Sequence, residues 1–280
     1  MNRCLGALLL LALTAAPALG QQRPLVTEDP EAIGAGRILI EGGFDFSRDA
    51  RYTVSGLQGS LWRVPTLGVS VGISSIAEIQ IDGGLYNRLS ISSRTDAPLS
   101  DLLDIGGNTT SDFEDIVIGT KVRLLSERPG RPAFALRFAT KLPNAQNESG
   151  LGLDTTDFFT SLILGKTVQS VRVVGNIGVG ILGDPTVGHR QNDVLTYGLS
   201  FARAMTDRAE IVGELNGRIS TRSGEPPPGT ETRGLLNLGA RYTTGAFRLD
   251  GAIFLGLNAV DPTVGFTGGF TYVFHAFEVY

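Results

Sequence analysis

The stretch Val264 to Phe274 reads VGFTGGFTYVF and carries the clearest structural signal in the chain. Its even-numbered positions are apolar, four of them aromatic, and the odd-numbered positions between them are small. A repeat of two residues with one apolar face is typical of a β-strand. The aromatic face fits lipid and the small face fits a lumen, as in the barrels of bacterial outer membranes.

A strand of this kind has to be paired on both edges, because an open sheet edge cannot survive in hydrocarbon. We therefore expect it to pair with the first strand, at residues 37–46, and so to close a barrel. A strand that ends in Tyr-Val-Phe near the C-terminus also resembles the terminal signal that the barrel-assembly machinery recognises. Residues 275–280 follow this signal, so the strand ends either at Phe274 or at Tyr280.

The composition fits a barrel and excludes one class of partner. Of the 280 residues, 37 are glycine and 19% are charged, against about 7% glycine and about 25% charged residues in an average protein. Glycine inside strands suits a twisted, tightly curved sheet. The net charge is −4 and no basic block is present, so we expect no nucleic-acid partner.

Residues 1–20 have the pattern of a cleaved signal peptide. Residues 1–3 give a charged start, 5–16 form an apolar core, and small residues precede a cleavage site after Gly20. A membrane-anchoring helix is the alternative, but the apolar core is too short to span a bilayer comfortably. The one cysteine, Cys4, lies in this segment. An exported chain without thiols fits the envelope of a Gram-negative bacterium.

After a polar lead-in at residues 21–36, twelve segments alternate between apolar and polar positions. We expect the lead-in to lie in the periplasm and to be too short to plug a lumen. Short and long connections alternate, and the long ones fall at 47–56, 92–112, 143–156, 183–193 and 220–232. The segments lie at 37–46, 67–73, 79–85, 116–124, 134–142, 158–164, 171–181, 195–202, 211–219, 236–242, 247–255 and 264–274.

An even strand number, short turns at one end and long polar loops at the other predict an all-β fold. The expected domain, residues 37–280, is a transmembrane antiparallel up-and-down barrel of twelve strands in the outer membrane. A secreted β-sandwich or a lipocalin-like barrel explains one-faced alternation equally well. These soluble folds explain neither the loop lengths, nor the charges on the opposite faces, nor the aromatic last strand.

Two segments also resemble a known family. Residues 24–30 read PLVTEDP, and the region 140–158 contains TKLPN followed by NESGLG. Together with the strand pattern, they resemble the outer-membrane barrel family named for the meta-pathway of phenol degradation. The resemblance implies a porin-like outer-membrane transporter of small solutes, hydrophobic or aromatic ones among them. It brings no established catalytic or binding residues with it.

Charged residues recur on the strand faces opposite the apolar ones, where the lumen is expected. A conduit whose charges select solutes explains them, and so does a salt-bridged interior that fills the barrel. Acids dominate the first three strands and bases the next four, which would set a field across the lumen. The lumen-facing candidates are Glu41, Asp45, Glu78, Asp82, Asp115, Lys121, Arg123, Arg137, Lys141, Arg172, Glu210, Glu214, Arg218, Arg241, Arg248 and Asp250.

The connection 92–112 is long and partly apolar, and Ser100 is a candidate cap for a short helix in it. One interpretation folds this loop into the mouth as a constriction. The other leaves it exposed beside lipopolysaccharide. The loop constriction candidates are Leu99, Leu102, Leu103 and Ile105.

The sequence gives little support for an enzyme. Its two histidines, His189 and His275, are far in sequence from the one G-x-S-x-G match, residues 68–72, which lies inside an expected strand and not at a strand-to-helix turn. No H-E-x-x-H motif is present, and the Gly-x-Gly runs lie in strands with no helix after them. We therefore expect no catalytic residue, no cofactor and no metal. The predicted function is a passive conduit, with a structural or adhesive barrel and then an outer-membrane hydrolase as alternatives. The expected partners are outer-membrane lipid, lipopolysaccharide, the assembly machinery and small solutes.

Overall fold

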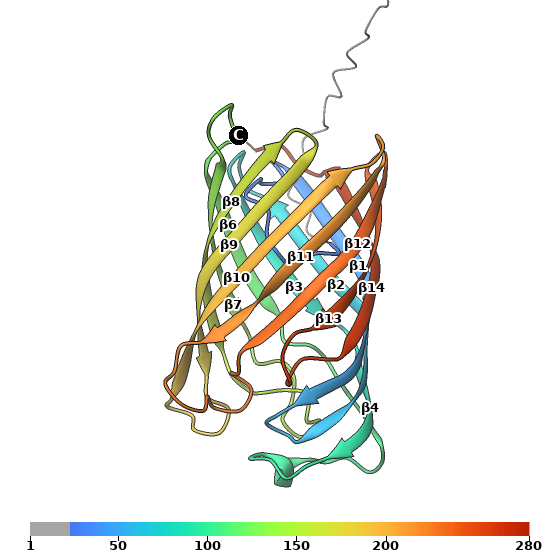
Figure 1. Ribbon diagram of the computed structural model, residues 1–280, viewed down its shortest axis with the longest axis vertical. Coiled ribbons are helices and arrows are strands. Elements are labelled where there is room, and N and C mark those ends of the chain that lie inside the picture. Colours follow the sequence, from blue (N-terminus) through green and yellow to red (C-terminus); the bar gives the residue numbers. More distant parts are fainter. Residues whose placement is uncertain (1–22, 280) are drawn as a thin grey trace, which may run out of the picture.

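The computed structural model describes residues 23–279, which form a closed antiparallel β-barrel (Figure 1). The expected signal peptide and Tyr280 lie outside the described residues. Within residues 23–279, no helix is long and apolar enough to cross a membrane. Twelve of the described strands form the wall in ring order, and β14 pairs back onto β1. They are β1 (Arg37–Tyr52), β2 (Leu57–Gly72), β3 (Ala77–Gly84), β6 (Val117–Leu125), β7 (Ala133–Lys141), β8 (Asp157–Val168), β9 (Val171–Gly183), β10 (Gln191–Ala204), β11 (Ala209–Ser220), β12 (Arg233–Thr244), β13 (Phe247–Gly256) and β14 (Val264–His275).

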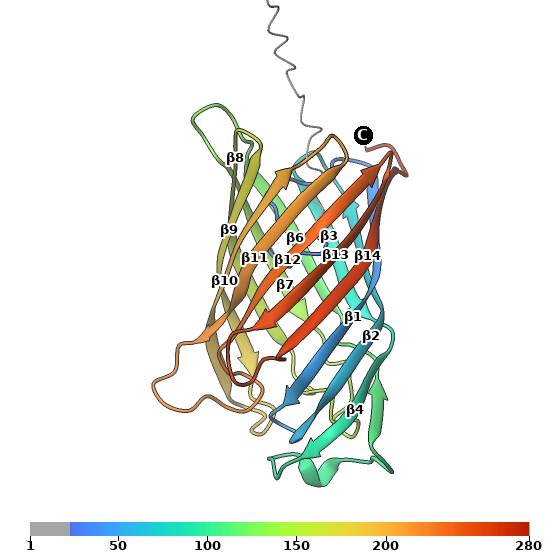
Figure 2. The ribbon, with the colours of Figure 1, turned by 45° about the vertical axis from the view of Figure 1, so that its right-hand side comes forward.

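The closing seam is the one that the last strand predicts. β14 pairs with β1 in an unbroken register that runs from Arg37 opposite His275 to Arg48 opposite Val264. The strand therefore ends one residue beyond Phe274, and residues 276–279 continue outside the sheet. We call the end of the barrel where β1 begins and β14 ends the terminal end, and the opposite end the loop end (Figure 2).

The alternation along each strand sorts side chains between the two faces of the wall. Phe138, Phe158 and Ile253 are 55%, 53% and 60% exposed, whereas Lys121 and Glu78 are 0% exposed. Successive residues of a strand point to opposite faces, so the large apolar side chains cover the outside and the charged ones point inward. A soluble barrel has the reverse distribution, with its apolar residues in the core.

The first hairpin is longer than the sequence indicates. A long loop was expected at 47–56, but β1 and β2 run on to a short turn at 53–56. Two register shifts between β1 and β2, one of them between Ser47 and Ala50, explain the error. A β-bulge inserts an extra residue and breaks the alternation without ending the strand. Asp49 within this bulge has a φ of 58°.

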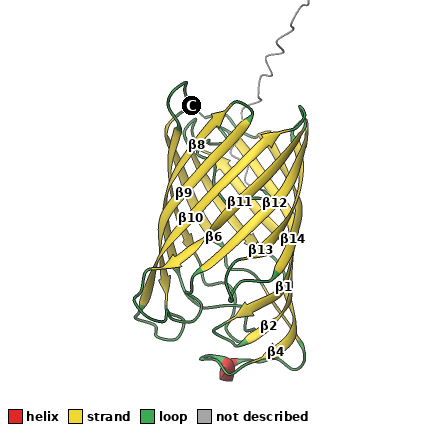
Figure 3. Ribbon diagram, viewed as in Figure 1, coloured by secondary structure: helices red, strands yellow, loops and turns green. Residues whose placement is uncertain are grey.

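The connection 92–112 also contains structure that the pattern did not indicate. β4 (Asn87–Arg94) and β5 (Thr109–Asp112) extend the sheet outward from the loop-end half of β2. A single turn of 3₁₀-helix, η1 (Ser100–Leu102), lies between them at the tip of the projection (Figure 3). The helix cap is Leu99 and carries no side-chain hydrogen bond, so the expected capping by Ser100 is wrong. The hydroxyl of Ser100 instead donates to the carbonyl of Ala97 (2.9 Å).

Candidate functional site

The described part of the lead-in, residues 23–36, lies inside the barrel rather than in the periplasm as expected. Glu28 is 5% exposed and Ile33 is 0% exposed. The expectation that so short a segment could not plug the lumen overlooked its reach. An extended chain covers about 3.3–3.6 Å per residue, so a segment of this length can cross the lumen of a small barrel.

The first described residue of the lead-in, Arg23, lies among the last three strands of the barrel and the first hairpin. Arg23 lies 3.5 Å from the carboxylate of Asp250, and its guanidinium donates to the hydroxyls of Thr66 (3.1 Å) and Thr267 (2.9 Å). The guanidinium of Arg241 donates to the carbonyl of Arg23 (2.7 Å). These contacts fix the start of the lead-in to four strands that surround it.

The middle of the lead-in is held by a single carboxylate. Glu214, 2% exposed, accepts hydrogen bonds from the backbone N–H groups of Val26 (2.9 Å) and Thr27. The amide of Asn237 donates to the same carboxylate (2.6 Å). A buried carboxylate needs such donors, because leaving a buried polar group without a hydrogen-bond partner costs about 1–3 kcal/mol of stability, and more when the group is charged. Glu214 is therefore both a lumen residue and an anchor for the backbone of the lead-in.

Three acids of the lead-in face the basic side of the lumen. Glu28 lies 3.3 Å from the ammonium of Lys121 and 3.0 Å from the guanidinium of Arg137. Asp29 lies 2.8 Å from Arg172. The third acid, Glu31, pairs with Arg123. The segregation of charge along the strands thus has a structural counterpart, because the lead-in supplies acids to β6, β7 and β9, which contain none of their own.

Glycines on the inner wall make room for the lead-in. A Cβ added at Gly198 would lie 2.7 Å from the hydroxyl oxygen of Thr27. A Cβ added at Gly165 would lie 2.7 Å from the ring of Pro30. Contacts this short do not occur between a real Cβ and a neighbour, so these two positions accept no larger residue while the lead-in is in place.

The lead-in contacts every strand of the wall, so it crosses the whole lumen. Besides the contacts above, its Arg23 N–H donates to Glu41 on β1 (3.4 Å), and its Ile33 N–H donates to Glu78 on β3 (2.7 Å). The wall residues that it touches, in ring order, are Glu41, Thr66, Glu78, Lys121, Arg137, Gly165, Arg172, Gly198, Glu214, Arg241, Asp250 and Thr267.

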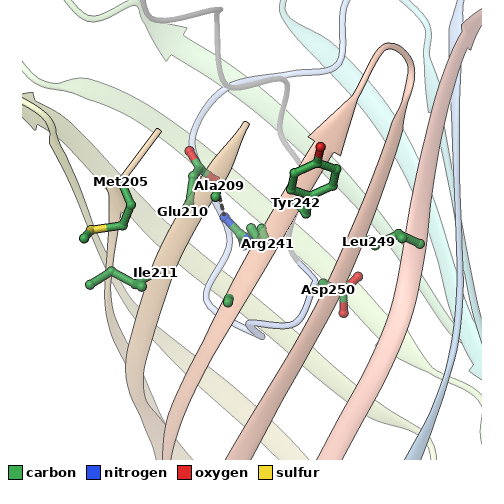
Figure 4. A pocket seen from close by; sticks show the side chains of 9 residues that line it. Met205, Ala209, Glu210, Ile211, Arg241, Tyr242, Leu249 and Asp250 are labelled. Carbon is green, nitrogen blue, oxygen red and sulfur yellow. Dashed lines mark ion pairs between the residues drawn. The ribbon is translucent and has the colours of Figure 1, made fainter. Parts of the chain in front are cut away.

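The remaining lumen-facing candidates pair with one another or with the wall. Lys141 bridges Asp115 (2.9 Å) and Asp157 (3.2 Å) near the loop end. Figure 4 shows the ion pair of Glu210 with Arg241 (3.9 Å). The two residues line a hollow together with apolar side chains, among them Ile211 and Leu249. The other candidates pair as follows: Asp45 with Arg63, Asp82 with Arg137, Arg218 with the carbonyls of Gly229 and Glu231, and Arg248 with the hydroxyl of Thr243.

Several polar residues of the interior were missed by the sequence analysis. Asp157 could have been predicted, because it directly precedes the outward-facing Phe158 in the same strand and so points to the inner face. Glu127, which pairs with Arg172 (2.6 Å), lies in a turn and gives no periodic signal. Desolvation would raise the pKa of Glu127, but the backbone N–H of Thr167 and the cations of Lys166 and Arg172 together lower it. This carboxylate therefore helps to hold the basic side of the lumen at the terminal end.

The loop constriction candidates do not act as one group. Leu103 and Ile105 pack against a buried cluster of Ala50, Leu57, Leu61 and Leu89, which joins the projecting sheet to the first hairpin. Leu102 is 52% exposed on η1. The N–H of Leu99 donates to the carbonyl of Val54 at the hairpin tip (3.0 Å).

The described residues offer little chemistry beyond these ion pairs. Within residues 23–279, no three His, Cys, Asp or Glu side chains gather so that they could hold a metal ion. His189 is exposed in the loop between β9 and β10, and His275 ends β14 at the opposite end of the barrel. The two histidines therefore belong to different ends of the molecule.

A closed barrel with an apolar outer wall and a charged interior defines the class of protein as a β-barrel of the membrane-spanning type. No family model matches the chain, and no curated protein matches it. Among solved structures, it is similar to the COG4313 outer membrane channel from Pseudomonas putida F1, with a TM-score of 0.63 and 14% identity over 88% of this chain and 98% of the other. It is also similar to the NanC porin, with a TM-score of 0.52 and 8% identity over 84% and 98% of the two chains. At these identities the likeness shows the fold, and membership of the meta-pathway family stays a prediction.

Proposed function

We propose that this chain is an outer-membrane conduit for small solutes. The observation that carries the proposal is the inverted polarity of the wall, with exposed Phe138 and Ile253 outside and buried Lys121 and Glu78 inside. An apolar outer surface without an open sheet edge suits hydrocarbon, and a polar interior suits solutes in water. The two most similar folds described above are named as a channel and a porin, which agrees with this role.

In this proposal the terminal end faces the periplasm and the loop end faces the outside of the cell. Solutes diffuse down their gradient, and the protein needs no cofactor and no energy source. The lead-in crosses the lumen, so it limits the flow, and solutes pass beside it or when it shifts. The outer wall contacts lipid, the loop end contacts lipopolysaccharide, and the last strand is the element that the assembly machinery recognises.

The solute class follows from the resemblance and from the charges of the lumen. The meta-pathway resemblance points to small aromatic solutes, and the interior adds fixed charges of both signs. The test is permeability of the full chain, purified and reconstituted in planar bilayers and in liposomes. We expect single-channel currents and swelling with small solutes. If the bilayers show no current and the liposomes do not swell, the proposed conduit function is wrong.

The proposal also holds that the chain is not an enzyme. Phospholipid hydrolysis by the purified chain is the relevant assay, with His189→Ala as the variant that removes the one histidine of the loop end. We expect no hydrolysis from either protein. Hydrolysis by the unmodified chain that disappears in His189→Ala would establish an outer-membrane hydrolase instead.

One observation supports a second role. The sheet of β4 and β5 projects beyond the loop end of the wall, with η1 at its tip. Such a projection is a natural contact surface for another cell or a host molecule. Adhesion that is lost when residues 95–108 are shortened, with permeability unchanged, would favour this structural or adhesive role.

A further inference from the structure

The tip of the first hairpin bends across the loop end of the barrel instead of standing away from it (Figures 1 and 2). There the turn 53–56 meets two other connections, 142–156 between β7 and β8 and 221–232 between β11 and β12. In the ring of wall strands, two strands separate each of these three connections from the next. Three evenly spaced connections therefore converge over the lumen.

Hydrogen bonds join the tip to both of the other connections. The hydroxyl of Ser55 donates to the carbonyl of Gly150 (2.8 Å). The N–H of Gly229 donates to the hydroxyl of Thr53 (3.0 Å). Ser55 is 4% exposed, so the first of these bonds is buried. The tip is thus fastened on two sides, through one short polar side chain on each side.

The centre of this contact is apolar. Val54 is 3% exposed although it lies in a turn, where side chains usually face solvent. A Cβ added at Gly229 would lie 2.9 Å from a methyl group of Val54 and 3.3 Å from a methyl group of Leu153. Val54 and Leu153 therefore meet at Gly229, above an interior that is lined by charges. An apolar contact thus lies at the loop end of a barrel whose interior is charged.

We propose that this contact is the outer constriction of the conduit and that Val54 and Leu153 select the solutes that enter. The proposal rests on the conduit function. An apolar constriction slows the passage of water and small ions, because its lining offers them no hydrogen bonds. An apolar group on a solute meets no such penalty. The favoured solutes are therefore small amphiphiles that carry an apolar or aromatic group beside a charged one, since the charged group finds partners in the lumen below.

The first experiment releases the tip. Thr53→Ala and Ser55→Ala together remove the two side-chain hydrogen bonds that fasten it to the neighbouring connections. We expect this double variant to raise the single-channel conductance at least threefold, because the tip is then free to move away from the mouth. Ser92→Ala, which removes a hydrogen bond on the projecting sheet, is the control and should leave the conductance unchanged. An unchanged conductance in the double variant would overturn the proposal.

The second experiment changes the chemistry of the contact itself. Val54→Ser makes the entrance polar, and liposome swelling compares phenylalanine with serine, which carry the same charges but differ in their side groups. We expect the ratio of phenylalanine to serine permeation to fall at least threefold. Val187→Ser, in the loop between β9 and β10, is the matched control and should leave the ratio unchanged.

The two proposals fail in different ways. If the unmodified chain gives no current and passes no solute, both the conduit proposal and the constriction proposal are wrong. Suppose instead that the unmodified chain carries currents, that Val54→Ser keeps the same permeation ratio, and that Thr53→Ala/Ser55→Ala keeps the same conductance. The conduit proposal would then stand, and only the constriction proposal would be wrong.

Discussion

Glu28→Ala should release the lead-in from the basic side of the lumen. The carboxylate of Glu28 is the shared partner of Lys121 (3.3 Å) and Arg137 (3.0 Å), and it accepts a hydrogen bond from Gln80 (3.2 Å). Lys121 is 0% exposed, so water cannot replace the lost charge. Of the three lead-in acids, Glu28 is the one that pairs with two strands at once.

The structure sets the size of the effect. Removing one partner of a buried ion pair costs about 3–5 kcal/mol. Lys121 keeps the carboxylate of Glu78 at 3.1 Å, so the low end of this range, about 3 kcal/mol, applies. At about 1.4 kcal/mol for each factor of ten, the population with a displaced lead-in should rise roughly 100-fold.

Two measurements check this prediction in the reconstituted full chain. Hydrogen exchange of peptides that cover residues 23–36 should speed up, and single-channel recordings should show longer or more frequent open periods. Glu31→Ala is the control, because Glu31 pairs with Arg123 alone and its side chain is 22% exposed. Partly exposed pairs contribute about 0–1 kcal/mol. Unchanged protection in Glu28→Ala, or a larger effect in Glu31→Ala, would refute the reasoning.

Three further predictions follow from the wall. Gly198→Ala should loosen the lead-in by placing a methyl group against Thr27, whereas Gly175→Ala, with open space around it, should not; exchange of residues 23–36 decides between them. Lys121→Met should lower the free energy of unfolding, measured by urea denaturation, by about 3–5 kcal/mol, because it leaves Glu28 and Glu78 buried without their shared cation. An unchanged urea midpoint would contradict the assigned ion pairs. Leu238→Arg, on the outer face and 56% exposed, should cost about 2–4 kcal/mol in lipid vesicles, and a neutral effect there would show that this face does not meet lipid.

The sequence predicted the wall of the barrel well, because the wall obeys a period of two. Each of the twelve expected segments matches a different wall strand, four of them running one residue past one end of it, and β14 pairs with β1 as anticipated. The errors fall where the period breaks. The bulge near Asp49 hid the outer halves of β1 and β2, and the small polar residues of β4 and β5 carry too few apolar positions to register as strands.

The site was only half visible in the sequence. The inward charges follow from their position opposite apolar residues, but the place of the lead-in does not. Its acids, Glu28, Asp29 and Glu31, pair with bases that lie 93, 143 and 92 residues further along the chain. A hint was present, since the basic strands β6, β7 and β9 contain no acid of their own. Likewise, the burial of Val54 depends on loops that meet only once the barrel has closed.

Conductance of the full chain in planar bilayers, compared with a chain that lacks residues 23–33, tests the central claim most directly. The account predicts small single-channel currents from the full chain and currents several-fold larger after the deletion, because the deleted segment crosses the lumen. Insertion of both proteins into the bilayer without current from either one would contradict it.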